Sequence, residues 1–124
     1  MSAFEVYETP DGSARFYFSH SDKEFTTGIL VLNPKAELSK HNRPHAIENL
    51  IQISGRCVMK LFETPTQSTD HTLLPGTKLV ISKGMYHLHS IPFDEESTTF
   101  FKAEGDITEI MDKLRQTNMN VTLN

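Results

Sequence analysis

Residues 41–48, which read HNRPHAIE, bring several potential metal ligands together within one short segment. His41, His45 and Glu48 offer imidazole nitrogen and carboxylate oxygen, which suit Fe, Mn, Ni, Cu or Zn. Arg43 is a poor ligand, because a guanidinium has no free lone pair and stays charged. If the segment is extended, His41, Arg43 and His45 point to one side, since side-chain direction alternates along a strand. The segment therefore indicates either a metal site or a polar loop.

A second histidine pair, His87 and His89, lies in the strand-like run YHLHSI at residues 86–91. Alternation along a strand places both imidazoles on one face. If this strand neighbours the segment that carries His41, four histidines and a carboxylate converge. That geometry requires a β-rich chain.

Most of the chain is predicted to form short strands separated by turns. Gly55 is expected to join two of them in a hairpin, and residues 64–70 are expected to form a polar loop. Short strands at this spacing favour a sandwich or barrel over a parallel α/β sheet. The expected strands are residues 4–8, 14–19, 27–33, 46–54, 56–63, 71–74, 77–82, 86–91 and 97–104.

A single helix is predicted over residues 106–117. Asp106 is its expected N-cap, and Glu109 would complete a capping box. One apolar stripe should dock on the barrel, because its members recur at helical spacing: Ile107, Ile110, Met111 and Leu114. The tail, residues 117–124, is either frayed or a short added strand.

Composition sets broad limits on the class of protein. The 124 residues suggest one domain, and the formal charge of −4 argues against nonspecific binding of nucleic acid. No apolar run is long enough to cross a membrane, and the segment MSAFEVYETPDG lacks the apolar centre of a signal peptide. Cys57 is the single cysteine and is expected to be a buried, inert thiol. We therefore expect a cytoplasmic protein without nucleic-acid or membrane partners.

The order and spacing of these residues resemble the two sequence motifs of the cupins. The first motif, G-x5-H-x-H-x3,4-E-x6-G, is matched by His41, Glu48 and Gly55. The second motif, G-x5-P-x-G-x2-H-x3-N, is matched at its glycines and at its histidine, His87. Four positions depart from the motifs: Lys35 and Ser82 replace a glycine and a proline, Arg43 replaces the second histidine, and Ile91 replaces the final asparagine.

The resemblance spans residues 27–103. It implies an all-β, cupin-type double-stranded β-helix, or jelly-roll barrel, similar to the RmlC-like cupins. We expect one such domain over residues 1–124, with the helix at its C-terminal end.

The family's metal ligands map onto His41, Glu48 and His87 of this sequence. A missing nitrogen would come from His89, which we prefer, or from His45. In the alternative, Arg43 pairs with Glu48 and no metal is bound. Gln52 either faces the same cavity as Glu48 or lies at a strand edge.

Three functions are compatible with this resemblance. The first is a metal-dependent enzyme that uses Fe, Mn, Ni or Zn on a small molecule, with Arg43 holding a carboxylate or phosphate of the substrate. The second is a metal-free module that binds a small anion or sugar through Arg43, His45 and His87, with Gln52 as a further candidate. The third is a homodimerisation domain, as the resemblance to the cupin domain of centromere protein C implies. We expect a homodimer, and the resemblance assigns no reaction.

Overall fold

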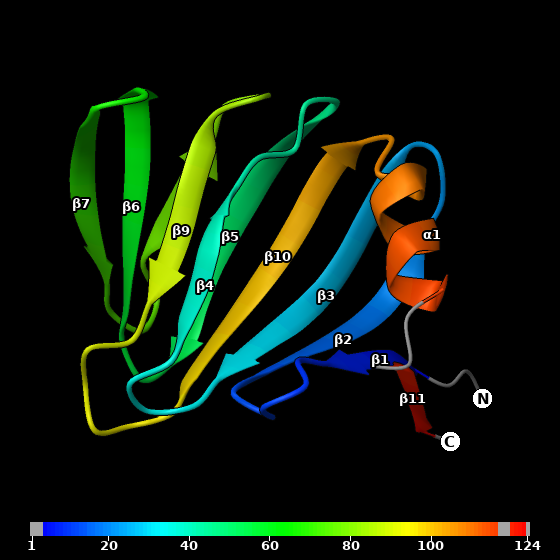
Figure 1. Ribbon diagram of the computed structural model, residues 1–124, viewed down its shortest axis with the longest axis horizontal. Coiled ribbons are helices and arrows are strands. Elements are labelled where there is room, and N and C mark those ends of the chain that lie inside the picture. The colour runs from blue at the N-terminus through cyan, green and yellow to red at the C-terminus, as the bar shows by residue number, and fades with distance from the viewer. Residues whose placement is uncertain (1–3, 117–119, 124) are drawn as a thin grey trace.

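The computed structural model describes residues 4–116 and the backbone of residues 120–123. Short strands form most of this part of the chain, with one helix near its C-terminal end (Figure 1). The strands are β1 (Phe4–Glu8), β2 (Ala14–Ser21), β3 (Phe25–Leu32), β4 (Glu37–His41), β5 (Ala46–Ser54), β6 (Cys57–Thr64), β7 (Gln67–Leu73), β8 (Lys78–Ile81), β9 (Tyr86–Ser90), β10 (Ser97–Gly105) and β11 (Asn120–Leu123).

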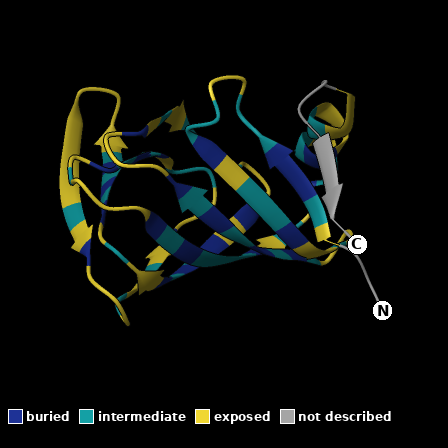
Figure 2. Ribbon diagram, turned by 90° about the horizontal axis from the view of Figure 1, so that it is seen from below, coloured by how far each residue is buried: buried dark blue, intermediate teal, exposed yellow. Residues whose placement is uncertain are grey.

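The strands form two antiparallel sheets that pack face to face. The larger sheet has the order β11-β1-β2-β3-β10-β5-β8, and the smaller has the order β4-β9-β6-β7. Buried residues alternate with more exposed ones along β3 and along most of β5, as expected for strands with one face on the core. Figure 2 shows buried, dark-blue segments next to teal and yellow ones along the strands. Leu32 and Leu50 of the larger sheet meet Met59 of the smaller sheet in this core. The predicted all-β barrel with a C-terminal helix is confirmed.

Helix α1 (Thr108–Gln116) packs across the larger sheet and forms a second apolar cluster with it. Met111 is fully buried in this cluster, and Ile107, Ile110 and Leu114 also pack there, so the predicted apolar stripe is confirmed. The carboxylate of Asp106 accepts a hydrogen bond of 2.9 Å from the backbone N–H of Thr108. The helix begins two residues later than predicted, and the predicted end at residue 117 lies outside the described residues.

The predicted hairpin at Gly55 is wrong. The strand before it, β5, belongs to the larger sheet, whereas β6 after it belongs to the smaller one. The chain therefore crosses between the sheets at Gly55, which has φ of 66°. An added Cβ would lie only 2.1 Å from the carbonyl oxygen of Glu96, so only glycine fits this close crossing.

Two further segments, residues 67–70 and 120–123, form strands. Residues 67–70 belong to β7, which pairs with β6 along the edge of the smaller sheet, so the predicted loop at 64–70 is wrong there. Polar side chains suit this strand because its residues 67–70 are exposed. The backbone of β11 pairs with β1. Of the two alternatives predicted for the tail, a frayed end or a short added strand, the structure has the strand.

The burial of Cys57 agrees with the prediction of an inert thiol. It has no exposed surface, and burial raises the pKa of this thiol to about 11. Within residues 4–116 and 120–123, no helix is both long and apolar enough to cross a membrane.

Candidate metal centre

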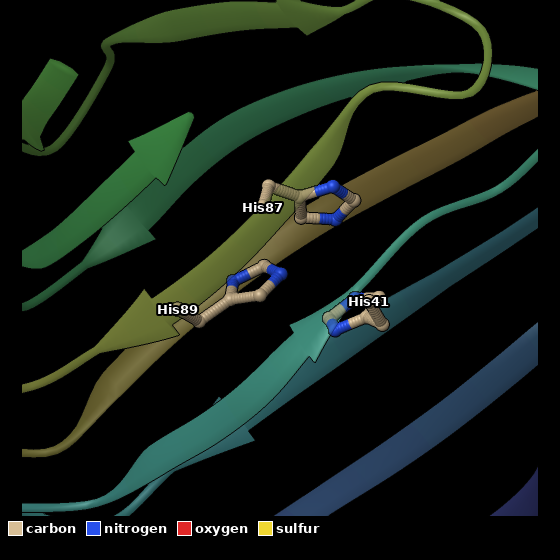
Figure 3. A group of neighbouring side chains, drawn as sticks. All are labelled: His41, His87 and His89. Carbon is tan, nitrogen blue, oxygen red and sulfur yellow. The ribbon is translucent and has the colours of Figure 1, made fainter. Parts of the chain in front are cut away.

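His41, His87 and His89 converge inside the barrel. One ring nitrogen from each lies within 4.8 Å of the other two. The ring centroids of His41 and His87 are 4.3 Å apart, and His89 lies 5.9 Å from His41 and 5.7 Å from His87. Figure 3 shows the two rings of β9 and the ring at the end of β4 projecting into one space. We call this group the histidine cluster.

Pairing between β4 and β9 places the histidine cluster. His41 lies opposite His87, and Leu38 lies opposite His89. These two pairs are out of register by one residue, so β4 contains one extra residue between Leu38 and His41. In a regular strand Leu38 and Lys40 would share a face. The irregularity instead turns His41 inward and leaves Lys40 exposed.

Hydrogen bonds to the backbone fix two of the imidazoles. Nδ1 of His41 lies 2.7 Å from the carbonyl oxygen of Ser39, and Nδ1 of His87 lies 3.1 Å from that of Met85. A carbonyl only accepts, so both Nδ1 atoms carry the proton and both Nε2 atoms keep a lone pair in the neutral ring. Metal-bound histidines commonly have this arrangement.

Two nitrogens in the cluster are buried without a hydrogen-bond partner. They are Nε2 of His87 and Nδ1 of His89. Buried polar atoms usually find partners, and an exception requires an explanation. A metal ion bound among the three imidazoles would satisfy both nitrogens. The residues present therefore fit a metal ion.

Glu48 lies beside the cluster and bridges it to Arg43. One carboxylate oxygen is 3.3 Å from Nε of Arg43, and the other is 3.4 Å from Nε2 of His87, without hydrogen-bond geometry. A neutral His87 would turn its lone pair toward this carboxylate, which is repulsive. The contact is favourable only when a proton or a metal ion lies on Nε2.

Burial and charge shift the ionisation of these groups. Burial, assisted by the charge of Arg43, lowers the pKa of His41 to about 4. Burial also lowers the pKa of His89 to about 3, with smaller contributions from His41 and His87. Burial alone would raise the pKa of Glu48, but His87 and Arg43 outweigh it and lower that pKa to about 2. Near neutral pH, His41 and His89 are therefore neutral, as metal ligands must be.

The structure does not bring His45 or Gln52 to the cluster. Residues 44 and 45 form a turn, so the segment is not extended through His45, and this residue is exposed instead of sharing a face with His41. Gln52 is 1% exposed and does not line the cavity beside the cluster. Its amide donates to the carbonyls of Ser54 and Gly55 and to the Ser97 hydroxyl, and accepts from Thr99.

The two motif segments are held together directly. The backbone N–H of Gly84 donates to the carbonyl of Arg43 at 3.0 Å. The side-chain amide of Asn42 donates to the carbonyl of Gly84 at 3.3 Å. The turn before β9 thereby fixes the segment that carries Arg43 next to the histidines.

The histidine cluster opens onto a cavity of about 100 Å³. Its polar end contains His41, His89, Arg43 and Glu48, and the rest of its wall is mainly apolar. Helix α1 forms one side of the cavity, a role that was not predicted from the sequence. The apolar wall consists of Phe16, Phe18, Leu30, Leu38, Leu50, Phe101, Ala103, Ile107, Ile110 and Leu114.

No protein-family model matches this chain, and no curated protein sequence matches it. Solved structures do match it. A recombinant oxalate oxidase in complex with glycolate is 14% identical, with a TM-score of 0.62 over 66% of this chain. The chain spans only 42% of the length of that oxidase.

Two smaller structures cover more of the chain. The CENP-C cupin domain of Drosophila melanogaster is 13% identical, with a TM-score of 0.71 over 82% of this chain and 72% of that domain. An RmlC-like cupin from Shewanella frigidimarina is 12% identical, with a TM-score of 0.69 over 84% of this chain and 86% of its own. These likenesses show that the fold is the cupin fold, as the motif spacing predicted.

Proposed function

We propose that the protein binds one divalent transition-metal ion through His41, His87 and His89, and binds a small anionic molecule beside it. The observation that carries the proposal is the convergence of three imidazoles, with two buried nitrogens that lack hydrogen-bond partners. An all-imidazole ligand set suits Fe, Ni or Zn, and Mn remains a candidate. In this proposal Glu48 is a neighbour of the site, and His89 takes the place of the missing motif histidine.

The remaining residues of the site would bind and orient the molecule. A bound ion acts as a Lewis acid that polarises an oxygen atom of its ligand. Arg43 lines the cavity, and its side chain is 21% exposed, so its guanidinium is within reach of a carboxylate group. Glu48 holds this guanidinium in place through the 3.3 Å contact. The apolar wall excludes water from the bound molecule.

Elemental analysis of protein purified without an affinity tag or chelator tests this proposal. We expect about one equivalent of metal per chain, lost in both His87→Ala and His89→Ala. The matched control is His45→Ala, because His45 is exposed and outside the cluster. A wild-type protein that acquires no metal on incubation with Fe²⁺, Mn²⁺, Ni²⁺ or Zn²⁺ would refute the proposal.

The second candidate is a metal-free homodimerisation domain. The pair between Arg43 and Glu48 and an exposed apolar patch on the larger sheet favour it. Ile47 and Ile53 on β5 are 37% and 49% exposed, and Val80 on the adjacent strand β8 is 60% exposed. Such a patch can be covered by a second copy of the chain.

Sedimentation at micromolar concentration tests the second candidate. A dimer that becomes monomeric in Val80→Lys, but not in Thr69→Lys on the exposed strand β7, would support it. A wild-type monomer would exclude it.

A further inference from the structure

A groove on the outer side of the smaller sheet is separate from the histidine cluster. Its volume is about 670 Å³, within the range of roughly 300–1,000 Å³ that small-molecule sites have. None of the residues that line it lines the cavity beside the cluster. We infer that this groove binds a planar aromatic molecule that carries an anionic group.

Side chains from three neighbouring strands form the floor of the groove. Phe62 of β6 lies opposite Tyr86 of β9, and Lys40 comes from β4, on the other side of β9 (Figure 1). Phe62 and Tyr86 are adjacent in sequence to the buried residues Leu61 and His87, so alternation along the strand turns both rings away from the core. The Tyr86 side chain is available to a ligand, because this residue is 49% exposed.

The two rings position the ammonium group of Lys40 without neutralising it. Its Nζ lies 4.0 Å from the ring centroid of Phe62 and 5.6 Å from that of Tyr86. An aromatic face attracts a cation but carries no net charge. The irregularity in β4 that turns His41 inward also leaves Lys40 on this outer side. The groove therefore presents a positioned positive charge that an anion can neutralise.

The groove is positively charged, although the whole chain has a formal charge of −4. Lys83, in the turn before β9, is its second cation. Lys102 lies 3.5 Å from a carboxylate, whereas neither Lys40 nor Lys83 forms an ion pair with any residue that the structure describes. Among these residues Glu63 is the one carboxylate that lines the groove, and it accepts a hydrogen bond from the hydroxyl of Thr69.

The walls of the groove suit an aromatic group. Pro65 contributes from the turn after β6, and Met85 contributes from the segment before β9. A thioether adapts its shape and makes favourable contacts with aromatic rings. A planar ring would pack against Tyr86 and Met85, while its anionic group would reach the lysines. Ring stacking and charge pairing would then act together.

Calorimetric titration of the full chain, as purified, tests the inference with three probes: 2-naphthyl phosphate, the uncharged 2-naphthol and inorganic phosphate. We expect 2-naphthyl phosphate to bind at least about fivefold more tightly than either of the others, because stacking and a charge-assisted hydrogen bond each contribute about that factor. An affinity for 2-naphthol or for inorganic phosphate that equals that of 2-naphthyl phosphate would overturn the inference.

Variants of the floor test where the probe lies. Lys40→Gln removes the charge and Tyr86→Leu removes the ring, so each should weaken 2-naphthyl phosphate binding about fivefold or more. Lys40→Arg and Tyr86→Phe keep these features and should bind within about twofold of the wild type. Lys78→Gln is the matched control, because Lys78 is an exposed lysine of β8 outside the groove. Unchanged affinity in folded Lys40→Gln and Tyr86→Leu variants would overturn the inference.

The groove can be distinguished from the proposed metal site by size and by substitution. A naphthyl ring does not fit the cavity of about 100 Å³, since roughly 150 Å³ is needed to hold benzene alone. His89→Ala removes a proposed metal ligand and should leave 2-naphthyl phosphate binding unchanged. Loss of binding in His89→Ala with full binding in Lys40→Gln would place the probe at the histidine cluster and overturn the inference.

Discussion

The guanidinium of Arg43 and the carboxylate of Glu48 face each other across the turn between β4 and β5, with Nε 3.3 Å from Oε1. Both side chains are largely buried, so each requires the other to offset the loss of water. The pair occupies the motif positions where the cupins place a histidine and a glutamate ligand. The proposed metal site therefore depends on His89.

This arrangement predicts different effects of two substitutions on metal affinity. Glu48→Gln changes a neighbour of the site and should weaken metal binding by no more than about 10- to 100-fold. His89→Ala removes a proposed ligand and should weaken metal binding more than Glu48→Gln does. Titration of each variant with Zn²⁺ against a competing chelator measures both effects. If Glu48→Gln lost metal binding and His89→Ala kept it, the ligands would instead be those of the cupin motifs: His41, Glu48 and His87.

Acid should destabilise the metal-free protein, beginning near pH 6.5. The pKa of His41 is about 4 in the folded protein and 6.5 for an unperturbed histidine, so the unfolded chain binds more protons between these values. Stability is therefore lost as the pH falls from 6.5 to 4. The pKa of Glu48 is lowered from 4.5 to about 2, so this carboxylate adds a further loss of stability as the pH falls from 4.5 to 2. Each group contributes on the order of 1 kcal/mol per pH unit.

Urea unfolding at a series of pH values measures this dependence. His41→Leu removes one of the two buried imidazoles whose pKa is lowered, the other being His89, so its free energy of unfolding should vary less between pH 6.5 and pH 4 than that of the wild type. A wild-type stability that is constant over this range would contradict the prediction.

Lys35 adopts a backbone conformation that favours glycine. Its φ is 66°, and it stands where the first cupin motif has a glycine. A left-handed conformation costs a residue with a Cβ roughly 1–2 kcal/mol, so Lys35→Gly should raise the free energy of unfolding by about 1 kcal/mol. The ammonium group lies 3.2 Å from Asp94, but Asp94 is 92% exposed and the contact contributes little.

Lys35→Ala is the matched control, because alanine also loses the ammonium group but keeps the Cβ. The free energy of unfolding of Lys35→Ala should not exceed that of the wild type. Equal losses of stability in both variants, measured by urea unfolding, would show that the contacts of the ammonium group outweigh the backbone strain.

Gln52 is predicted to stabilise the fold without contributing to the site. Gln52→Leu removes the hydrogen bonds of the buried amide and leaves the hydroxyls of Ser97 and Thr99 without these partners. The free energy of unfolding should fall by about 3 kcal/mol, while metal content is unchanged. Gln67→Leu, at an exposed position of β7, should alter stability by less than about 0.5 kcal/mol. A loss of metal in a folded Gln52→Leu variant would contradict this assignment.

Motif spacing predicted the fold because it reflects the lengths of strands and turns. The interval from Gly76 through Gly84 to His87 corresponds to β8, a turn and the start of β9. His89 was identified for a similarly local reason, since His87 and His89 alternate on one strand. The pairing of Arg43 with Glu48 was one of two alternatives that the sequence left open.

Features that depend on distant partners were not predicted. The hairpin at Gly55 was wrong because the sequence does not show which sheet each strand joins. The cavity wall was missed because the apolar stripe of α1 does not indicate which residues it faces. His45 lies outside the cluster because the chain turns at Pro44, and alternation along an extended segment does not predict that turn.

The extra residue in β4 means that the distance along the chain from Leu38 to His41 is not fixed by strand periodicity. If Ser39 were deleted, a regular strand would still place the imidazole of residue 41 opposite His87, because the original pairs differ by one residue. A chain shortened by this residue should therefore still bind the proposed metal ion, which elemental analysis would verify. Among related sequences, a gap of one position before this histidine would be compatible with the same site.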